Sequence, residues 1–155
     1  MYGFRHILSP GRERYRAAFF GFEAKDGTMG KALTGRSVIL IVEDDFFLRM
    51  DAVDILSHAG YLAVEAGDAD EAIAILEVRP DIHVIFTDVQ MPGSMDGLQL
   101  ARFVKNRWPP IKIVGTSGLA DLGEKDLPEG GCFVSKPYQA AEIVRAVGEV
   151  LGARQ

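Results

Sequence analysis

Apolar residues between positions 37 and 152 alternate between short continuous runs and longer stretches with helical spacing. The continuous runs are five to seven residues long, which is typical of strands buried on both faces. These predicted strands cover residues 37–43, 61–67, 83–88, 111–117 and 132–136. A strand buried on both faces needs helices on each side of its sheet, so the pattern indicates an α/β protein.

The stretches with helical spacing predict amphipathic helices over residues 46–60, 68–80, 95–110 and 139–152. In the first of these, the apolar stripe consists of Leu48, Ala52, Ile55, Leu56 and Ala59. The second begins with a capping pattern, in which Asp68 is followed three residues later by Glu71. Residues 119–131 have too few apolar residues and too many glycines and prolines for a full helix, so we expect a short or irregular one there.

Strands that alternate with helices imply βαβ units, right-handed crossovers and a parallel sheet. We therefore expect a three-layer α/β/α protein with a doubly wound, five-stranded parallel sheet. The fourth helix, between the fourth and fifth strands, is the weakest predicted element.

The composition is that of a globular protein, with 155 residues of which 48% are hydrophobic and 25% charged. No apolar run approaches the roughly 18 residues of a membrane span, and the N-terminus lacks the apolar core of a secretory signal. Cys132 is the only cysteine, so no disulfide can form within the chain. These features predict a cytoplasmic protein.

Charge divides the chain near residue 36. Residues 1–36 carry seven basic and three acidic residues, whereas residues 37–155 carry ten basic and nineteen acidic ones. The acidic part is poorly suited to bind nucleic acid, because that affinity comes largely from neutralising phosphates. We predict a basic N-terminal extension over residues 1–36 and one folded domain over residues 37–155.

The extension allows several interpretations. A helix here would gather aromatic and basic residues, namely Tyr15, Phe19, Phe22, Arg12 and Arg16. The segment could be a flexible basic arm, a helix docked on the acidic domain, or a segment that binds a membrane surface or a partner. Translation could also start at Met29 instead of Met1.

Polar residues of complementary chemistry stand at the carboxyl ends of four predicted strands. Glu43 and Asp44 end the first strand, Asp88 the third, Ser117 the fourth and Lys136 the fifth. In an open parallel sheet, functional groups gather at this edge. Three carboxylates, a hydroxyl and an ammonium are therefore expected to converge.

An all-oxygen cluster of this kind suits Mg²⁺, which leaves coordination positions open for phosphate oxygens. With the metal and Lys136 neutralising charge, Asp88 can stay ionised and attack phosphorus, and Ser117 can bind a phosphoryl oxygen. A single acid after a strand is more often a helix cap or turn former, and we interpret Asp45 as such a cap. Complementary groups on four strand ends favour an aspartyl-phosphate site instead.

The motifs LIVEDD, FTDVQMPGSMDG, TSG and SKPY resemble the signature of the response-regulator receiver domain of two-component signalling. They occur in that family's order and cover about residues 37–152. The resemblance implies a flavodoxin-like sheet with strand order 2-1-3-4-5. It also implies Mg²⁺ as cofactor and a histidine kinase or histidine phosphotransfer protein as phosphoryl donor.

The resemblance further implies a role for each acidic residue of the site. Asp88 would be the phosphoacceptor and would also bind the metal. Asp44 would be a direct magnesium ligand, whereas Glu43 would act largely through water. The backbone carbonyl of Gln90 would be a further magnesium ligand from the protein.

By the same resemblance, Ser117 is the switch hydroxyl, Lys136 contacts the phosphoryl group, and Pro137 follows in a peptide bond that is often cis. Phe133 takes the place of the family's rotating aromatic switch residue, without the hydroxyl of the commoner tyrosine. The loop after Asp88 is one residue longer than usual, and Gly93–Ser94 absorbs the insertion.

The implied function is that of a single-domain response regulator, which signals to a downstream protein and catalyses only its own phosphorylation and dephosphorylation. No helix-turn-helix or catalytic module is visible, which favours output through protein contacts. A phosphatase of the aspartyl-phosphate type would need a general acid where Gln90 stands. A phosphorylation-independent binding module is the other alternative, and the formation of homodimers stays open.

Overall fold

A five-stranded parallel sheet forms the centre of residues 35–152, the part of the chain that this computed structural model describes. Its strands are β1 (Val38–Val42), β2 (Leu62–Ala66), β3 (Ile82–Asp88), β4 (Lys112–Ser117) and β5 (Cys132–Ser135). All paired strands are parallel, and their spatial order is β2-β1-β3-β4-β5. This order confirms the predicted doubly wound sheet.

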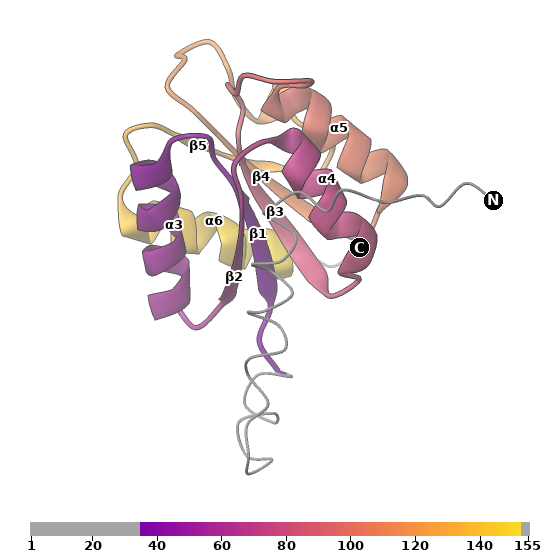
Figure 1. Ribbon diagram of the computed structural model, residues 1–155. Coiled ribbons are helices and arrows are strands. Elements are labelled where there is room, and N and C mark those ends of the chain that lie inside the picture. Colours follow the sequence, from indigo (N-terminus) through magenta and orange to yellow (C-terminus); the bar gives the residue numbers. More distant parts are fainter. Residues whose placement is uncertain (1–34, 153–155) are drawn as a thin grey trace, which may run out of the picture. The chain divides into compact units, whose positions relative to one another are not determined.

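The α-helices of the described part cover both faces of the sheet (Figure 1). They are α3 (Phe46–His58), α4 (Ala69–Val78), α5 (Gly97–Arg107) and α6 (Ala140–Gly152). α3 and α6 pack against each other on one face, whereas α4 and α5 lie on the other. The three-layer α/β/α prediction is therefore confirmed.

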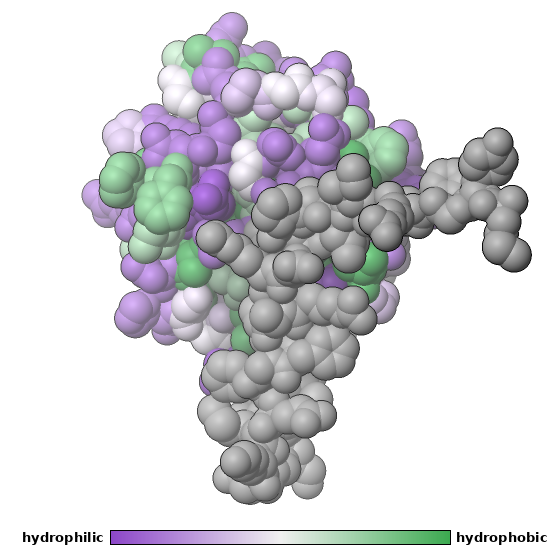
Figure 2. All heavy atoms as spheres, viewed as in Figure 1, coloured by the Kyte–Doolittle hydropathy of each residue, from purple (hydrophilic) through white to green (hydrophobic). Residues whose placement is uncertain are grey.

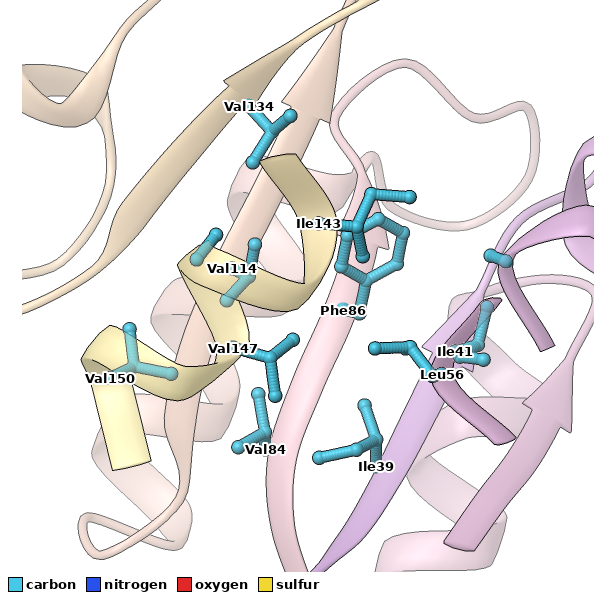
Figure 3. Close-up of a cluster of buried hydrophobic side chains, with 12 residues drawn as sticks. Ile39, Ile41, Leu56, Val84, Phe86, Val114, Val134, Ile143, Val147 and Val150 are labelled. Atoms are coloured by element: carbon cyan, nitrogen blue, oxygen red, sulfur yellow. The ribbon is translucent and has the colours of Figure 1, made fainter. Parts of the chain in front are cut away.

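Apolar side chains on both faces of the strands explain their burial. All five residues of β1 are buried. On the face covered by α3 and α6, side chains from four strands and both helices form one cluster (Figure 3). Its members are Ile39, Ile41, Ala52, Leu56, Val84, Phe86, Val114, Val134, Ile143, Ala146, Val147 and Val150. Burying one large apolar side chain contributes about 1.5–3 kcal/mol, so this cluster is a main source of stability.

Aspartate side chains cap three of the helices. Asp45 Oδ1 accepts a hydrogen bond from the amide three residues later at the start of α3, which confirms the interpretation of Asp45 as a cap. Asp68 does the same for α4, and Asp96 forms a reciprocal capping box with Gln99 at the start of α5. Because this box sets the helix start, α5 begins at Gly97, two residues later than predicted.

The apolar stripe predicted for α3 is partly wrong. Ala52 and Leu56 are buried and Ile55 packs against the core, but Leu48 is 38% exposed and Ala59 is exposed as well. Leu48 lies in the first turn of the helix and Ala59 is its C-cap. The contact with the sheet is therefore confined to the centre of the helix.

Between β4 and β5 the chain forms only a 3₁₀ turn, η1 (Glu124–Asp126), which confirms the short or irregular fourth helix. Leu127 follows this turn and is buried against Gly115 of β4. A Cβ atom at Gly115 would lie 2.9 Å from Leu127 Cδ2, so the glycine makes room for the leucine. A single side chain thus covers sheet surface that a longer helix would otherwise cover.

Some sequence-based expectations lie outside the described residues. These are the interpretations of the basic extension, including its aromatic residues Tyr15, Phe19 and Phe22, and the choice between Met1 and Met29 as the start. Within residues 35–152, no helix is both long enough and apolar enough to cross a membrane.

We predict that Gly97→Ala lowers the free energy of unfolding by about 3 kcal/mol or more. A Cβ atom at this position would lie 2.7 Å from Val89 Cα and still nearer to the carbonyl oxygen of Asp88, so the backbone at the end of β3 would have to move. Urea denaturation followed by circular dichroism measures the effect. Gly123→Ala is the matched control, because a Cβ atom there meets no atom within 4 Å. Equal stabilities of the two variants would contradict the prediction.

Candidate functional site

Strand register brings the polar strand ends together. The pairing of β1 with β3 runs up to the residues immediately before Glu43 and Asp88, so these two acids lie side by side at the edge of the sheet. The pairing of β4 with β5 joins Ser117 to Ser135, and Lys136 follows directly. β5 therefore ends one residue earlier than predicted, and the lysine stands just beyond the strand.

Lys136 forms ion pairs with two of the carboxylates. Its Nζ lies 3.0 Å from Glu43 Oε2 and 3.2 Å from Asp88 Oδ2. The exposed fraction of the side chain is 19% for Lys136, 6% for Glu43 and 9% for Asp88. Because water screens these pairs only weakly, their attraction exceeds that of surface ion pairs.

The electrostatic balance of the site is negative. Burial raises the pKa of Glu43, the hydrogen bond from Lys136 offsets part of this rise, and the charge of Asp88 adds to it. Burial alone would lower the pKa of Lys136, but its hydrogen bond to Glu43 and the charge of Asp88 raise that pKa above its ordinary value. Lys136 is therefore held as an ammonium ion among acids that outnumber it.

Three carboxylates are placed to hold a metal ion. One oxygen from each of Glu43, Asp44 and Asp88 lies within 4.8 Å of the other two. Both oxygens of Glu43 already accept hydrogen bonds, from the Asp45 amide at 3.1 Å and from Lys136 at 3.0 Å. Asp44 is exposed, which leaves room for water ligands. An all-oxygen set of this kind, with excess negative charge and an open side, fits a hard divalent cation.

Two backbone amides connect the site to the loops that follow β3 and β4. Gln90 N donates a hydrogen bond to Asp88 Oδ1 at 3.1 Å, and Leu119 N donates one to Ser117 Oγ at 3.0 Å. Asp88 and Ser117 are both buried. Each loop is thereby tied to a side chain that the sequence assigns to phosphoryl chemistry.

An open groove of about 530 Å³ lies between these two loops. It is lined by Val89, Gln90, Met91, Pro92, Asp96, Leu98, Leu119 and Leu122. On its β3 side the loop turns at Gly93, whose φ of 117° is a conformation that glycine adopts readily. Ser94 Oγ donates a hydrogen bond to Asp70 Oδ1 at 2.7 Å, so the loop is anchored to α4 at the position of the predicted insertion.

Aromatic residues precede and follow Lys136 along the chain. Phe133 is half-buried on β5, and the Lys136–Pro137 peptide bond is cis, as expected from the resemblance. The ring of Tyr138 packs edge to face against Phe86, with a distance of 6.2 Å between the ring centroids. Burial raises the pKa of Tyr138, which keeps its hydroxyl protonated.

Sequence reasoning missed two groups that touch this edge of the sheet. Arg49 of α3 donates a hydrogen bond to the carbonyl oxygen of Glu43 at 2.9 Å. Its only signal in the sequence is a polar position away from the apolar stripe, which is equally typical of a solvated side chain. The Leu119 amide left no signal at all, because a backbone donor is independent of residue type.

Comparison with known proteins shows the family to which this chain belongs. Residues 39–148 match the family model of the response regulator receiver domain. The chain is 34% identical over 145 residues to the sensor kinase CckA of Brucella abortus, an alignment that covers 90% of this chain and 15% of that protein. It is 31% identical over 116 residues to the response regulator receiver protein CpdR of the same species, covering 73% of this chain and 95% of CpdR.

A similar solved structure is the response regulator receiver protein from Sinorhizobium medicae, with a TM-score of 0.73 and 28% sequence identity. That match covers 79% of this chain and 99% of the solved chain. The chain belongs to the response regulator receiver family, the receiver class of two-component systems. It is thus similar to CpdR along nearly all of that protein, but it spans only 15% of CckA and 54% of PdtaR from Mycobacterium tuberculosis.

Membership in this family carries general properties. Receiver domains are signalling modules that do not process external substrates, and they bind Mg²⁺ at an acidic pocket. They interact with histidine kinases or phosphotransfer proteins. The acidic cluster of Glu43, Asp44 and Asp88 is the corresponding feature of this chain.

Crowding of negative charge predicts that Asp88→Asn stabilises the protein when divalent ions are absent. The substitution removes a charge that repels Glu43 and Asp44, and Lys136 keeps Glu43 as its partner. We expect the free energy of unfolding, measured by urea denaturation in EDTA, to rise by about 1 kcal/mol. Asp44→Asn is the matched control and should give a smaller rise, because Asp44 is exposed. Destabilisation by Asp88→Asn would show that attraction to Lys136 outweighs the repulsion.

Proposed function

We propose that this protein is a response regulator that accepts a phosphoryl group on Asp88. The observation that carries the proposal is a buried aspartate paired with Lys136 at the carboxyl ends of the strands, beside two further acids. The donor is a phosphohistidine of a histidine kinase or histidine phosphotransfer protein. The similarity over 95% of CpdR supports a single-domain role, with output through contact with a downstream protein.

Magnesium is the cofactor that the site fits. Asp44 and Asp88 would bind the ion directly, together with the backbone carbonyl of Gln90. Glu43 would act through water, because both of its carboxylate oxygens already accept hydrogen bonds. When bound, the ion supplies positive charge to the phosphoryl oxygens and orients them for transfer.

The transfer step needs one nucleophile and no further reactant. An oxygen of the Asp88 carboxylate forms a bond to phosphorus while the P–N bond of the phosphohistidine breaks, and the electron pair of that bond stays on the imidazole nitrogen. Lys136 neutralises charge on the phosphoryl group, and the Ser117 hydroxyl donates a hydrogen bond to one of its oxygens. Hydrolysis later returns the carboxylate and inorganic phosphate, so the protein catalyses only its own phosphorylation and dephosphorylation.

Exposed apolar side chains beside the site fit the docking of a donor protein. Phe46, Phe47 and Met50 are 55%, 79% and 45% exposed, and they lie in the first turns of α3, which begins two residues after Asp44. Figure 2 shows apolar side chains at the surface over this helix. Large apolar groups grouped at a surface often mark a contact site. We assign this surface to the donor, whose phosphohistidine must reach Asp88 past it.

The loops beside the site provide a route for the signal. The Ser117 Oγ that would bind a phosphoryl oxygen also accepts the hydrogen bond from the Leu119 amide, so rotation of this side chain toward the phosphoryl group would weaken that hydrogen bond. Acyl phosphate formation also changes the carboxylate that accepts a hydrogen bond from the Gln90 amide. Because Leu119 and Gln90 line the same groove, phosphorylation would reshape it together with the surface around β4 and β5. Phe133 lacks a hydroxyl and would take part through a change in burial.

Incubation with acetyl phosphate and Mg²⁺ is expected to add one phosphoryl group to the wild-type protein and none to Asp88→Ala. Intact mass spectrometry measures the adduct, and EDTA should abolish it. Asp81→Ala is the matched control, since this aspartate pairs with Arg79 before β3 begins and should leave phosphorylation unchanged. A folded wild-type protein without an adduct would refute the proposal and favour a phosphorylation-independent binding module.

Beryllofluoride, a mimic of the phosphoryl group on aspartate, is expected to speed amide hydrogen exchange over residues 118–122 when Mg²⁺ is present. In Ser117→Ala the Leu119 amide has lost its acceptor, so exchange should already be fast and should change little on adding beryllofluoride. Hydrogen exchange with mass spectrometry makes the comparison. Ser135→Ala is the control, because this serine is exposed at the end of β5 and should respond like the wild type. Unchanged exchange in the wild type would exclude this loop from the signal.

A further inference from the structure

Arg49 joins three elements at the edge of the sheet that carries the site. From α3, its Nη1 donates a hydrogen bond to the carbonyl oxygen of Glu43 at 2.9 Å, and its Nε donates one to Glu65 Oε1 of β2 at 3.2 Å. The guanidinium carbon also lies 5.6 Å from the centroid of the Phe46 ring. The side chain is only 19% exposed. Arg49 is therefore held in one orientation by contacts on several sides.

These contacts act on the peptide that connects the acidic pair. The carbonyl group that Arg49 binds belongs to the peptide bond between Glu43 and Asp44. The amide of Glu43 is held separately, since it donates a hydrogen bond to the Ala66 carbonyl at 3.1 Å. With both ends of the Glu43 backbone held, the direction in which Asp44 leaves the strand is set. An arginine fork suits this task, because its planar donors keep a fixed geometry.

We propose that Arg49 is a positioning residue for the metal site, holding the backbone of the acidic pair so that the Asp44 carboxylate faces Asp88. The inference rests on the proposed function, because it concerns the same three carboxylates. Its contacts are with the Glu43 carbonyl, Glu65 and Phe46, so Arg49 would act without touching the metal or the phosphoryl group. Its effect passes through the main chain of Glu43, in the way that supporting hydrogen bonds orient metal ligands.

Charge and geometry predict opposite effects of replacing Arg49. As a cation near an acidic cluster, Arg49 opposes the binding of Mg²⁺ by charge alone, so its removal would tighten binding. As a positioning residue it favours binding, so its removal would weaken it. The direction of the change in Mg²⁺ affinity therefore distinguishes the two roles.

The test is titration of the full-length protein with Mg²⁺ by isothermal calorimetry. We expect Arg49→Gln to raise the dissociation constant for Mg²⁺ by about tenfold or more, in the range found for residues that support metal ligands. Arg49→Lys should weaken binding as well, because it keeps the charge but cannot make both hydrogen bonds in the same geometry. Tighter or unchanged binding by Arg49→Gln would overturn the proposal.

Two controls separate positioning from other effects. Arg107→Gln makes the same substitution in the last turn of α5, where Arg107 forms an exposed pair with Glu77, and it should leave Mg²⁺ affinity unchanged. Glu65→Gln keeps an oxygen for Arg49 Nε and removes the charge, so Mg²⁺ affinity should stay within about twofold of wild type. A Glu65→Gln effect as large as that of Arg49→Gln would assign the effect to this ion pair and overturn the proposal.

A kinetic measurement tests whether Arg49 has a merely structural role. We expect the Mg²⁺ concentration that gives half the maximal rate of phosphorylation by acetyl phosphate to rise in Arg49→Gln. The rate at saturating Mg²⁺ should stay close to that of the wild type, because Asp88, Ser117 and Lys136 are unchanged. A loss of rate that saturating Mg²⁺ does not restore would mean general damage to the site and would count against positioning.

The wild-type protein separates failure of this inference from failure of the proposed function. If the wild type binds no Mg²⁺ and gains no phosphoryl group, the function itself is wrong. If the wild type does both and Arg49→Gln binds Mg²⁺ equally well, only the role of Arg49 is wrong.

Discussion

The ion pairs of Lys136 with Glu43 and Asp88 are the interaction on which the site depends. Three acids at one sheet edge repel each other, and burial raises the cost of their charges. Lys136 follows β5, whereas Glu43 follows β1 and Asp88 ends β3, so the lysine side chain must pass the end of β4 to reach them. β4 ends in the small residue Ser117, which leaves that passage open. Lys136 can therefore neutralise these acids only when β1, β3, β4 and β5 are assembled in this order. The ion pairs of the site and the sheet thus stabilise each other.

Close backbone contacts hold the loops that carry the chemistry. Gly97 lets the start of α5 lie directly against the end of β3, which sets the path of the chain after Asp88. Gly115 lets Leu127 seat on β4, so the segment before β5 is anchored without a full helix. Side chains larger than hydrogen at either position would push these segments apart. The geometry of the site thus depends on these two glycines, which have no side chain, as well as on the residues that carry the chemistry.

The reduced fourth helix changes what the molecule presents near the site. A 3₁₀ turn and one buried leucine take its place, and an apolar groove opens between the loops after β3 and β4. Both loops donate amide hydrogen bonds to the side chains assigned to phosphoryl binding. A change at Asp88 therefore has a short physical path to an apolar surface. In the proposed mechanism, this path would run through main-chain donors and would not need a hydroxyl on Phe133.

The sequence by itself determined the fold class, the strands and the identity of the acidic, hydroxyl and lysine groups. Buried strands and capped helices produce patterns among residues that are close together in the sequence, so these elements can be predicted from short stretches of it. Only the tertiary structure decided which apolar positions of α3 are buried, where α5 begins and what Arg49 contacts. Those outcomes depend on partners distant in sequence, or on backbone atoms that every residue shares. For that reason the residues that meet at the site could be predicted from the sequence, whereas the groups that hold them in place could not.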